Sequence, residues 1–449
     1  MRLSLEKKSQ VFGLLTLALS FGVLLLEEMS AERGAAMLLA YALPAGWVLL
    51  GLSLCRKGAK GMLWLGGAMV GWFVLSRVLL GEHYLETSQE ALGHFVAAYL
   101  VALPFAQVWD QEGRRRGLGL MCLLCAVMTS LLAWLGVGAV MTGRDISLPA
   151  LGRCFYVDGG RLYVLGYPNL GACAFLLGLI CTAYLALTLR KKWLIPLWLL
   201  MALGLWTGIA FTVSRTVMIQ CALFAAGAVF LLIWRSPLRS AWLRVLAGAV
   251  AAAVVLALGY LSFTWIVEGA SQFGAQAAET VQTGAAEIAS RPLERDLQTM
   301  TGRTGAFKGF FDLIRHRPRV LALGVLNKDL VVELNRYIPH QVLAVYYHTH
   351  NAFLQTTLHL GLPGLAMALW LTFLCLRSAV RILLLAPKGR VSAAEGLMPL
   401  ACLVLLVGTI SEVYLFTDCF PICNSMFLLF LGYALQTEKR LRAEGRVKA

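Results

Sequence analysis

Apolar segments long enough to cross a membrane as helices recur along almost the whole 449-residue chain. A helix needs about 20 such residues to cross the ~30 Å hydrocarbon core of a bilayer. The composition agrees, because 59% of the residues are hydrophobic and 14% are charged, which is far more apolar than a typical soluble domain. We therefore predict an all-α polytopic membrane protein in which residues 1–449 form a single membrane domain.

Hydropathy predicts about twelve spans, each able to satisfy its backbone hydrogen bonds internally. The basic start MRLSLEKK and the apolar residues after it are similar to a signal sequence. Because further spans follow, we interpret this segment as an uncleaved first helix. The predicted spans are residues 11–26, 35–55, 62–80, 91–108, 117–141, 170–189, 193–212, 216–234, 245–267, 362–384, 396–417 and 420–436.

Clusters of Lys and Arg lie in every loop on one side of this arrangement. They are Arg2, Lys7 and Lys8; Arg56, Lys57 and Lys60; Arg114, Arg115 and Arg116; Arg190, Lys191 and Lys192; Arg235, Arg239 and Arg244; Arg377, Arg381, Lys388 and Arg390; and Lys439, Arg440, Arg442, Arg446 and Lys448. Short cytoplasmic loops carry such an excess, so both termini are predicted to be cytoplasmic. We therefore interpret the net charge of +15 as a sign of orientation in the membrane. Nucleic acid is not expected as a partner, because the sequence has no basic groove interleaved with aromatic residues.

Two longer segments are predicted on the outer side. Residues 143–169 join the fifth and sixth spans, and residues 268–349 form a large, partly helical loop between the ninth and tenth spans. The large loop opens with a low-complexity stretch that could form a surface helix. A second helix is predicted to begin at Gly302-Arg303, with an apolar face made of Phe307, Phe310, Phe311 and Ile314.

The segment HTHNAFLQTTLHLGLPGL, residues 348–365, joins this loop to the tenth span. A helix through it would place His350, Leu354 and Leu358 on one face. A bend into the span is predicted at the helix-breaking residues Gly361, Pro363 and Gly364. A lone histidine at a helix entry is often a cap or a solvated residue, but the orientation places His350 on the same membrane face as several arginines.

Arg215 lies in a tight turn between two spans, at the outer membrane face. Charged residues at such a depth are costly and are usually paired or functional. Its guanidinium could grip a diphosphate or extend to lipid phosphates; both interpretations stay open. Arg77 and Glu412 fall at similar depths, and we expect them to form a buried ion pair that holds the bundle together.

No metal or cofactor site is predicted. The chain has no HExxH, P-loop or dinucleotide-binding glycine pattern. Cys122 and Cys125, and also His94 and His359, are interpreted as core or interfacial residues. A disulfide among the outer cysteines is left open; these are Cys154, Cys419 and Cys423.

Four motifs in this order resemble the O-antigen ligase family, which is related to O-antigen polymerases. The chain has an outer loop with Arg161 and a Pro168-Asn169 helix start, and it has the Ser214-Arg215-Thr216 turn. It also has the Gly302-Arg303 helix start and, most specifically, His350-Asn351 followed by Gly361 and Gly364. The likeness covers roughly residues 150 to 370.

The resemblance implies a bacterial cytoplasmic-membrane (inner-membrane) glycosyltransferase that works at the outer face without a metal. Its donor would be a glycan on a polyprenyl diphosphate, undecaprenyl in particular, and its acceptor a glycan or glycolipid such as lipopolysaccharide core. Arg215 and Arg303, with Arg161 and Asn351, would bind the substrate. His350 would be the catalytic base that takes the acceptor's proton, which implies inversion at the anomeric carbon. His348 is the second choice for the base.

Two other functions remain open at this point. A polysaccharide polymerase would join lipid-linked repeat units with the same donor site and differ only in its acceptor. A secondary transporter is also compatible with twelve spans, but no internal repeat or matching pair of broken helices supports it.

Overall fold

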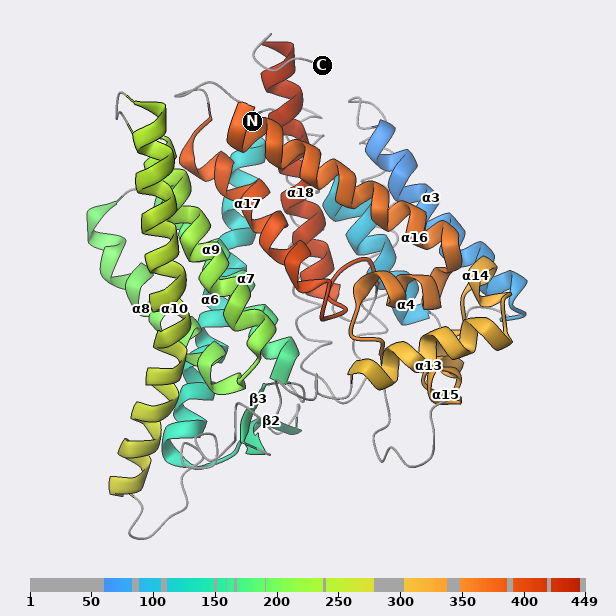
Figure 1. Ribbon diagram of the computed structural model, residues 1–449, viewed down its shortest axis with the longest axis horizontal. Coiled ribbons are helices and arrows are strands. Elements are labelled where there is room, and N and C mark those ends of the chain that lie inside the picture. The colour runs from blue at the N-terminus through green and yellow to red at the C-terminus, as the bar shows by residue number, and fades with distance from the viewer. Residues whose placement is uncertain are drawn as a thin grey trace, which may run out of the picture.

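The computed structural model describes residues 60–82, 89–105, 111–148, 152–158, 160–164, 168–189, 191–236, 240–277, 303–336, 348–385, 391–417 and 421–444. They form a helical bundle with a small sheet at one end (Figure 1). The predicted spans at 11–26 and 35–55 lie outside the described residues, as does most of the low-complexity stretch of the large loop.

Seven described helices are long and apolar enough to cross a membrane. They are α3 (Lys60–Leu79), α6 (Gln111–Thr142), α7 (Pro168–Leu189), α8 (Ile195–Thr212), α9 (Arg215–Trp234), α10 (Ala241–Ala277) and α16 (Ala352–Ala379), which a π-helical segment extends over Val380–Leu385. Two shorter apolar stretches are Ala91–Phe105, which includes most of α4 (Gln89–Phe95), and α17 (Ala393–Gly408). The helix α18 (Pro421–Ala443) follows. These helices agree with the predicted all-α membrane class, and the number of twelve spans stays a prediction.

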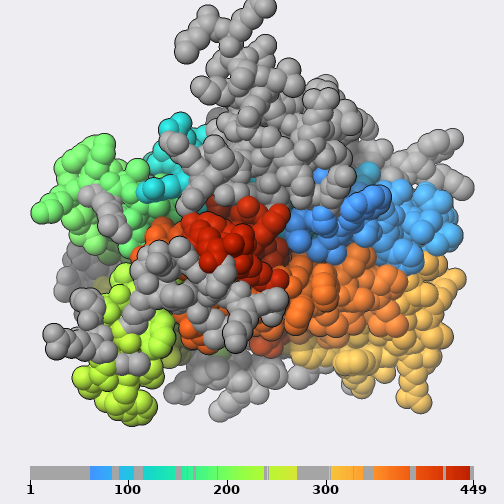
Figure 2. All heavy atoms as spheres, turned by 90° about the horizontal axis from the view of Figure 1, so that it is seen from above, coloured from blue at the N-terminus to red at the C-terminus, as the bar shows by residue number. Residues whose placement is uncertain are grey.

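The bundle has a buried centre and an apolar outside. Every residue of α18 from Pro421 to Leu435 is buried, and a view from the end where α18 finishes shows this helix between α3 and α16 on one side and α8 and α10 on the other (Figure 2). By contrast, only 6% of the span in α10 is buried, and large apolar side chains such as Leu258 are exposed along it. An apolar helix with this exposure is suited to lipid contact.

The outer segment 143–169 contains a three-stranded antiparallel sheet that the sequence analysis did not predict. Its strands are β1 (Ile146–Leu148), β2 (Gly152–Asp158) and β3 (Arg161–Val164). Only Gly159 and Gly160 separate β2 from β3, which is the turn length and composition of a tight hairpin. Phe155 pairs with Val164 and both are buried, whereas Tyr156 and Tyr163 stack at 4.9 Å on the other face. The sheet positions Arg161 at the start of β3.

The bend predicted in α16 is present at Gly361, which has a left-handed φ of 66°. Pro363 has no N–H, so the break leaves carbonyls without their helical donors. Other elements supply the donors: the Val325 N–H bonds Leu358 O at 2.8 Å, and the Trp72 indole bonds Leu360 O at 2.7 Å. At membrane depth such replacement is required, because no water is present to hydrogen-bond a free carbonyl.

The predicted ion pair between Arg77 and Glu412 is wrong. Arg77 is fully buried, and its guanidinium donates to the carbonyl of His359, just before the bend, and to the carbonyl of Val325, in the loop after α14. Arg77 thus bonds backbone carbonyls, one of them in the broken helix, and joins α3 to the bend and to the loop after α14. Glu412 lies in a different cluster with Arg303.

The large loop folds partly into the helices α13 (Arg303–His316), α14 (Val320–Leu323) and α15 (Leu330–Asn335). The helix predicted to begin around Gly302-Arg303 is present, and Gly302 lies outside the described residues. The apolar face is rotated from the prediction, because Ala306, Phe310 and Leu313 are buried whereas Phe311 is 60% exposed. This small core closes against Leu358 of α16, which holds α13 beside the end of the bundle that carries the sheet (Figure 1).

Candidate functional site

A non-helical turn after α17 is the centre of the site. The predicted span 396–417 ends early, because α17 finishes at Gly408 and residues 409–417 are irregular. Four apolar residues of this segment are fully buried inside the protein: Val413, Tyr414, Leu415 and Phe416. Their apolar character made the segment resemble the end of a membrane span in the sequence. Irregular backbone at this depth is tolerated where protein surrounds it. We call Thr409–Glu412 the 409–412 turn.

The 409–412 turn contacts the first residues of α16 and α9. Thr409 O accepts the backbone N–H of Ala352 at 2.9 Å. Ile410 O accepts the side-chain amide of Asn351, the N-cap of α16, at 3.1 Å. The next residue, Ser411, forms a hydroxyl–hydroxyl bond of 2.9 Å with Thr216 in the first turn of α9.

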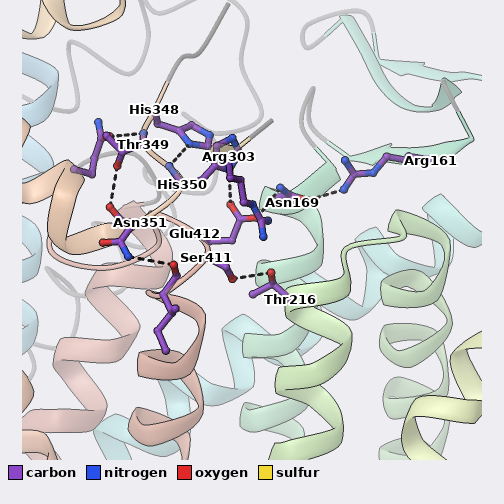
Figure 3. A network of polar contacts seen from close by, with 12 residues as sticks. Arg161, Asn169, Thr216, Arg303, His348, Thr349, His350, Asn351, Ser411 and Glu412 are labelled. Atoms are coloured by element: carbon purple, nitrogen blue, oxygen red, sulfur yellow. Dashed lines mark hydrogen bonds and ion pairs between the residues drawn. The ribbon is translucent and has the colours of Figure 1, made fainter. Parts of the chain in front are cut away.

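The side chain of Glu412, the last residue of the turn, contacts α7 and α13. One of its carboxylate oxygens, Oε1, accepts Arg303 Nη2 at 3.0 Å and the Asn169 side-chain amide at 3.1 Å (Figure 3). Arg303 is the first residue of α13, and Asn169 is the second residue of α7. Four helices therefore begin around one short turn. Each N-terminus carries a partial positive charge and free N–H groups, so this point of the protein favours anions.

His350 faces the second carboxylate oxygen of Glu412. The distance from His350 Nδ1 to Glu412 Oε2 is 3.7 Å, and both atoms are buried without a hydrogen-bond partner. The side chain of Glu412 is 1% exposed, whereas those of His350 and Arg303 are 21% and 26% exposed. A buried carboxylate thus lies beneath an imidazole and a guanidinium that solvent can reach.

His350 was predicted to lie on a helix face, and this prediction is wrong. Helix α16 begins only at Ala352, and His350 adopts a left-handed φ of 53° in the turn before it. Its backbone N–H approaches His348 Nδ1 at 3.4 Å, and the two rings meet edge to face at 4.1 Å. Burial lowers the pKa of His348 to about 4, and His350 and Arg303 lower it while Glu412 raises it. His348 is therefore a weak base, and this disfavours it as the alternative candidate for the catalytic base.

Asn351 has a structural task in this turn. Its side-chain oxygen accepts the N–H groups of Phe353 and Leu354, both at 3.0 Å, which is the hydrogen bonding of an N-cap. Its amide nitrogen donates to Ile410 O. These bonds hold the turn that carries His350, while the amide nitrogen keeps a second N–H. The role of Asn351 as a substrate ligand stays a prediction.

Arg161 joins the cluster through Asn169. Its Nη2 donates to Asn169 Oδ1 at 2.6 Å, and its Nε donates to Thr212 O at 2.9 Å. Thr212 ends α8, so Arg161 links the sheet, α7 and the α8–α9 turn. Arg161 is thus linked to Glu412 through the side chain of Asn169 (Figure 3).

Arg215 begins α9 in the same region. It is partly exposed and directly precedes Thr216, whose hydroxyl contacts the 409–412 turn. Ser214 is the N-cap of α9, but its side chain makes no capping hydrogen bond, so backbone N–H groups of the first turn are left for another acceptor.

Backbone strain gathers around the site. Among the described residues, three that are not glycine have a positive φ: Val213 at 51°, His350 at 53° and Phe416 at 69°. The first lies in the α8–α9 turn, and the third follows the 409–412 turn. For a β-branched residue such as Val213, this conformation is a genuine outlier. Strain of this kind persists where the surrounding structure enforces it, most often at functional sites.

Glu412 was not predicted as a member of the site. Its predicted position near the outer end of a span does not give the direction of a side chain. A signal was present in Ser411-Glu412, two polar residues inside an otherwise apolar run. Within the described ranges, no three His, Cys, Asp or Glu side chains gather as a metal site would require.

Comparison with known families fits this geometry. Residues 199–369 match the family model described as O-Antigen ligase, a range that contains Arg215, Arg303 and His350. No curated protein matches the chain. The matched range holds the starts of α9, α13 and α16, three of the four helices that meet at the 409–412 turn, and it supports assignment to the O-antigen ligase family.

Proposed function

We propose that the protein transfers a glycan from a polyprenyl-diphosphate carrier to an acceptor hydroxyl at the outer face of a bacterial cytoplasmic membrane. The family implies membrane glycosyltransferases of the ligase or polymerase type. The observation that carries the proposal is the meeting of Arg303 and His350 on the buried carboxylate of Glu412. A cation for a leaving group and a base for a nucleophile lie side by side there.

The donor's diphosphate is assigned to Arg303 and Arg215. Both residues begin helices, so each adds a guanidinium to a helix N-terminus that already favours anions. Arg161, which reaches Glu412 through Asn169, adds a third guanidinium group to the same region. As the glycosidic bond to phosphate breaks, the negative charge of the departing diphosphate grows, and preformed cations stabilise it most at that moment.

His350 is assigned as the base. Its Nδ1 faces Glu412, which leaves Nε2 for the acceptor hydroxyl. The hydroxyl proton passes to Nε2 while the acceptor oxygen forms a bond to the anomeric carbon from the side opposite the diphosphate, so the configuration inverts. Glu412 then stabilises the imidazolium, as a carboxylate behind a catalytic histidine does. The 3.7 Å separation suits a contact that shortens when the proton arrives.

The charge distribution supports the proposed orientation. Arg377 and Arg381 lie at the end of α16 remote from His350 and contact the buried Glu438. Arg235 at the end of α9 binds the carbonyls of Val391 and Ser392. Helices that begin at the site thus finish among basic residues, as the positive-inside rule requires if the site faces outward.

Reconstitution in liposomes tests the proposal directly. Purified protein with an undecaprenyl-diphosphate-linked glycan and a glycolipid acceptor should form the transferred product and release undecaprenyl diphosphate in equal amounts. Transfer should continue in EDTA, because no metal takes part in the proposed step. Hydrolysis of the donor at the same rate without acceptor would refute a transferase.

Deletion of the gene distinguishes a ligase from a polymerase, since the two differ only in the acceptor. Full-length glycans left on the carrier lipid would identify a ligase. Single repeat units that fail to grow would identify a polymerase. Unchanged surface glycans and carrier lipids would contradict both.

A further inference from the structure

A second polar cavity lies at the opposite end of the bundle from the transfer site. Its volume is about 450 Å³, within the range of small-ligand pockets. Thr188 lines it near the end of α7, 19 residues after Asn169 at the transfer site. At ~1.5 Å per helical residue the two sites are roughly 28 Å apart, so the cavity does not belong to the site described above.

Four helices build this cavity at the basic end of the bundle. The polar lining residues include Arg115, Tyr184, Thr188, Glu395, Gln436 and Arg440. They come from the start of α6, the end of α7, the start of α17 and the end of α18. Leu118, Leu187 and Met398 add an apolar part to the wall. The cavity is therefore amphipathic and lies where the spans end.

The carboxylate in the cavity is already satisfied. Glu395 closes a capping box with Ser392 at the start of α17, and its other oxygen pairs with Arg440 at 2.9 Å. The remaining charge in the lining is Arg115, which is exposed. Within the part of the chain that the structure describes, Arg115 makes no hydrogen bond or ion pair. The lining thus keeps one positive charge without a counter-ion.

Two further polar atoms in the lining lack partners. Arg440 Nε and Gln436 Oε1 are buried with no hydrogen-bond partner. Buried polar atoms without partners are costly. A ligand that accepts hydrogen bonds from guanidinium groups and also offers a hydroxyl to Gln436 would satisfy both.

We propose that this cavity binds the phosphate-bearing headgroup of an anionic phospholipid such as phosphatidylglycerol. Arg115 and Arg440 Nε donate to the phosphate, and the headgroup hydroxyls reach Gln436. The apolar wall accommodates the start of the acyl chains. Basic pockets between helices at the cytoplasmic surface are suited to such headgroups, and a bound lipid would fasten the ends of four helices together.

Native mass spectrometry of the detergent-purified full chain tests this, with phosphatidylglycerol, phosphatidylcholine and glycerol 3-phosphate as separate probes. The wild type should bind one phosphatidylglycerol about tenfold more tightly than phosphatidylcholine, because the ammonium group of choline is repelled by Arg115 and choline offers no hydroxyl to Gln436. Arg115→Gln should remove this preference. Arg116→Gln, at the adjacent exposed arginine that does not line the cavity, should keep it.

A steric pair separates the cavity from general surface charge. Thr188→Trp should fill the cavity and abolish tight binding with no change of charge, whereas Leu189→Trp, one residue further along α7, should not. Binding of glycerol 3-phosphate with the same dependence on Arg115 and Thr188 would support a phosphate site filled from solution. Equal losses in Arg115→Gln and Arg116→Gln, or no saturable binding of any probe, would overturn the proposal.

Discussion

Glu412 is the side chain on which the site converges, through Asn169, Arg303 and His350. In Glu412→Gln the amide oxygen can still accept from Arg303 and Asn169, but the negative charge behind His350 is lost. Transfer should fall by roughly 10²–10⁴-fold, the range of general acid–base effects. Donor binding should be unchanged or tighter, because Arg303 is released from an opposing charge.

A transfer assay and a donor-binding assay on one preparation check this prediction. Glu333→Gln is the matched control, since Glu333 is also buried and paired with arginines, Arg317 and Arg336, in the large loop. A parallel loss of donor binding and transfer in Glu412→Gln would instead indicate a purely structural carboxylate.

The arginines at the helix starts should act on the donor. Arg303→Ala and Arg215→Ala should weaken donor binding and the chemical step together, because the diphosphate carries charge before and during bond cleavage. Lys at either position should restore only part of the activity, since it keeps the charge and loses the planar fork. Arg319→Ala, at an exposed arginine just before α14, should leave donor affinity unchanged, and a similar loss there would imply nonspecific attraction.

His348 gives the fold a pH dependence. Because burial lowers its pKa from 6.5 to about 4, the unfolded chain binds more protons than the folded chain between these values. Stability should therefore be complete above about pH 6.5 and should fall as the pH approaches 4. Thermal unfolding of the detergent-purified protein across this range, compared with His348→Gln, measures the contribution. An identical pH profile in the variant would remove His348 as the cause.

At the scale of elements, Arg77 is predicted to stabilise the bend in α16. Arg77→Met leaves the buried carbonyls of Val325 and His359 without these donors, at a cost of about 1–3 kcal/mol for each. Arg77→Lys should lose less, because an ammonium group can still donate to one of them. Chemical unfolding in detergent would rank the three proteins. Equal stability of the Met variant and the wild type would contradict this role.

Some helices, strands and turns could be predicted from the sequence, and others could not. The long helices were predictable because a membrane span requires about 20 consecutive apolar residues. The helix-breaking residues Gly361 and Pro363 predicted the bend. The sheet was missed although Gly159-Gly160 between apolar alternations marks a hairpin. The turn after α17 was hidden, because residues buried in protein are as apolar as residues in lipid. The arginines and His350 could be named from their motifs, but their meeting on Glu412 depends on helix rotation, which hydropathy does not encode.

At the scale of the whole molecule, the account requires one orientation in the membrane. Helices that begin at the 409–412 turn, such as α7 and α9, end at the basic side. Alkaline phosphatase fused after Ala449 should be inactive and a fluorescent protein there active, whereas phosphatase inserted in the large loop should be active. The reverse pattern would place His350 in the cytoplasm and exclude chemistry at the outer face.

In the proposed mechanism His350 takes the acceptor's proton. Single-turnover glycan transfer by reconstituted His350→Ala and His348→Gln, with donor binding measured on the same preparations, tests this step. His350→Ala should bind the lipid-linked donor but form no product, while His348→Gln should retain most of the transfer. Wild-type turnover in His350→Ala, or loss only in His348→Gln, would exclude His350 as the base.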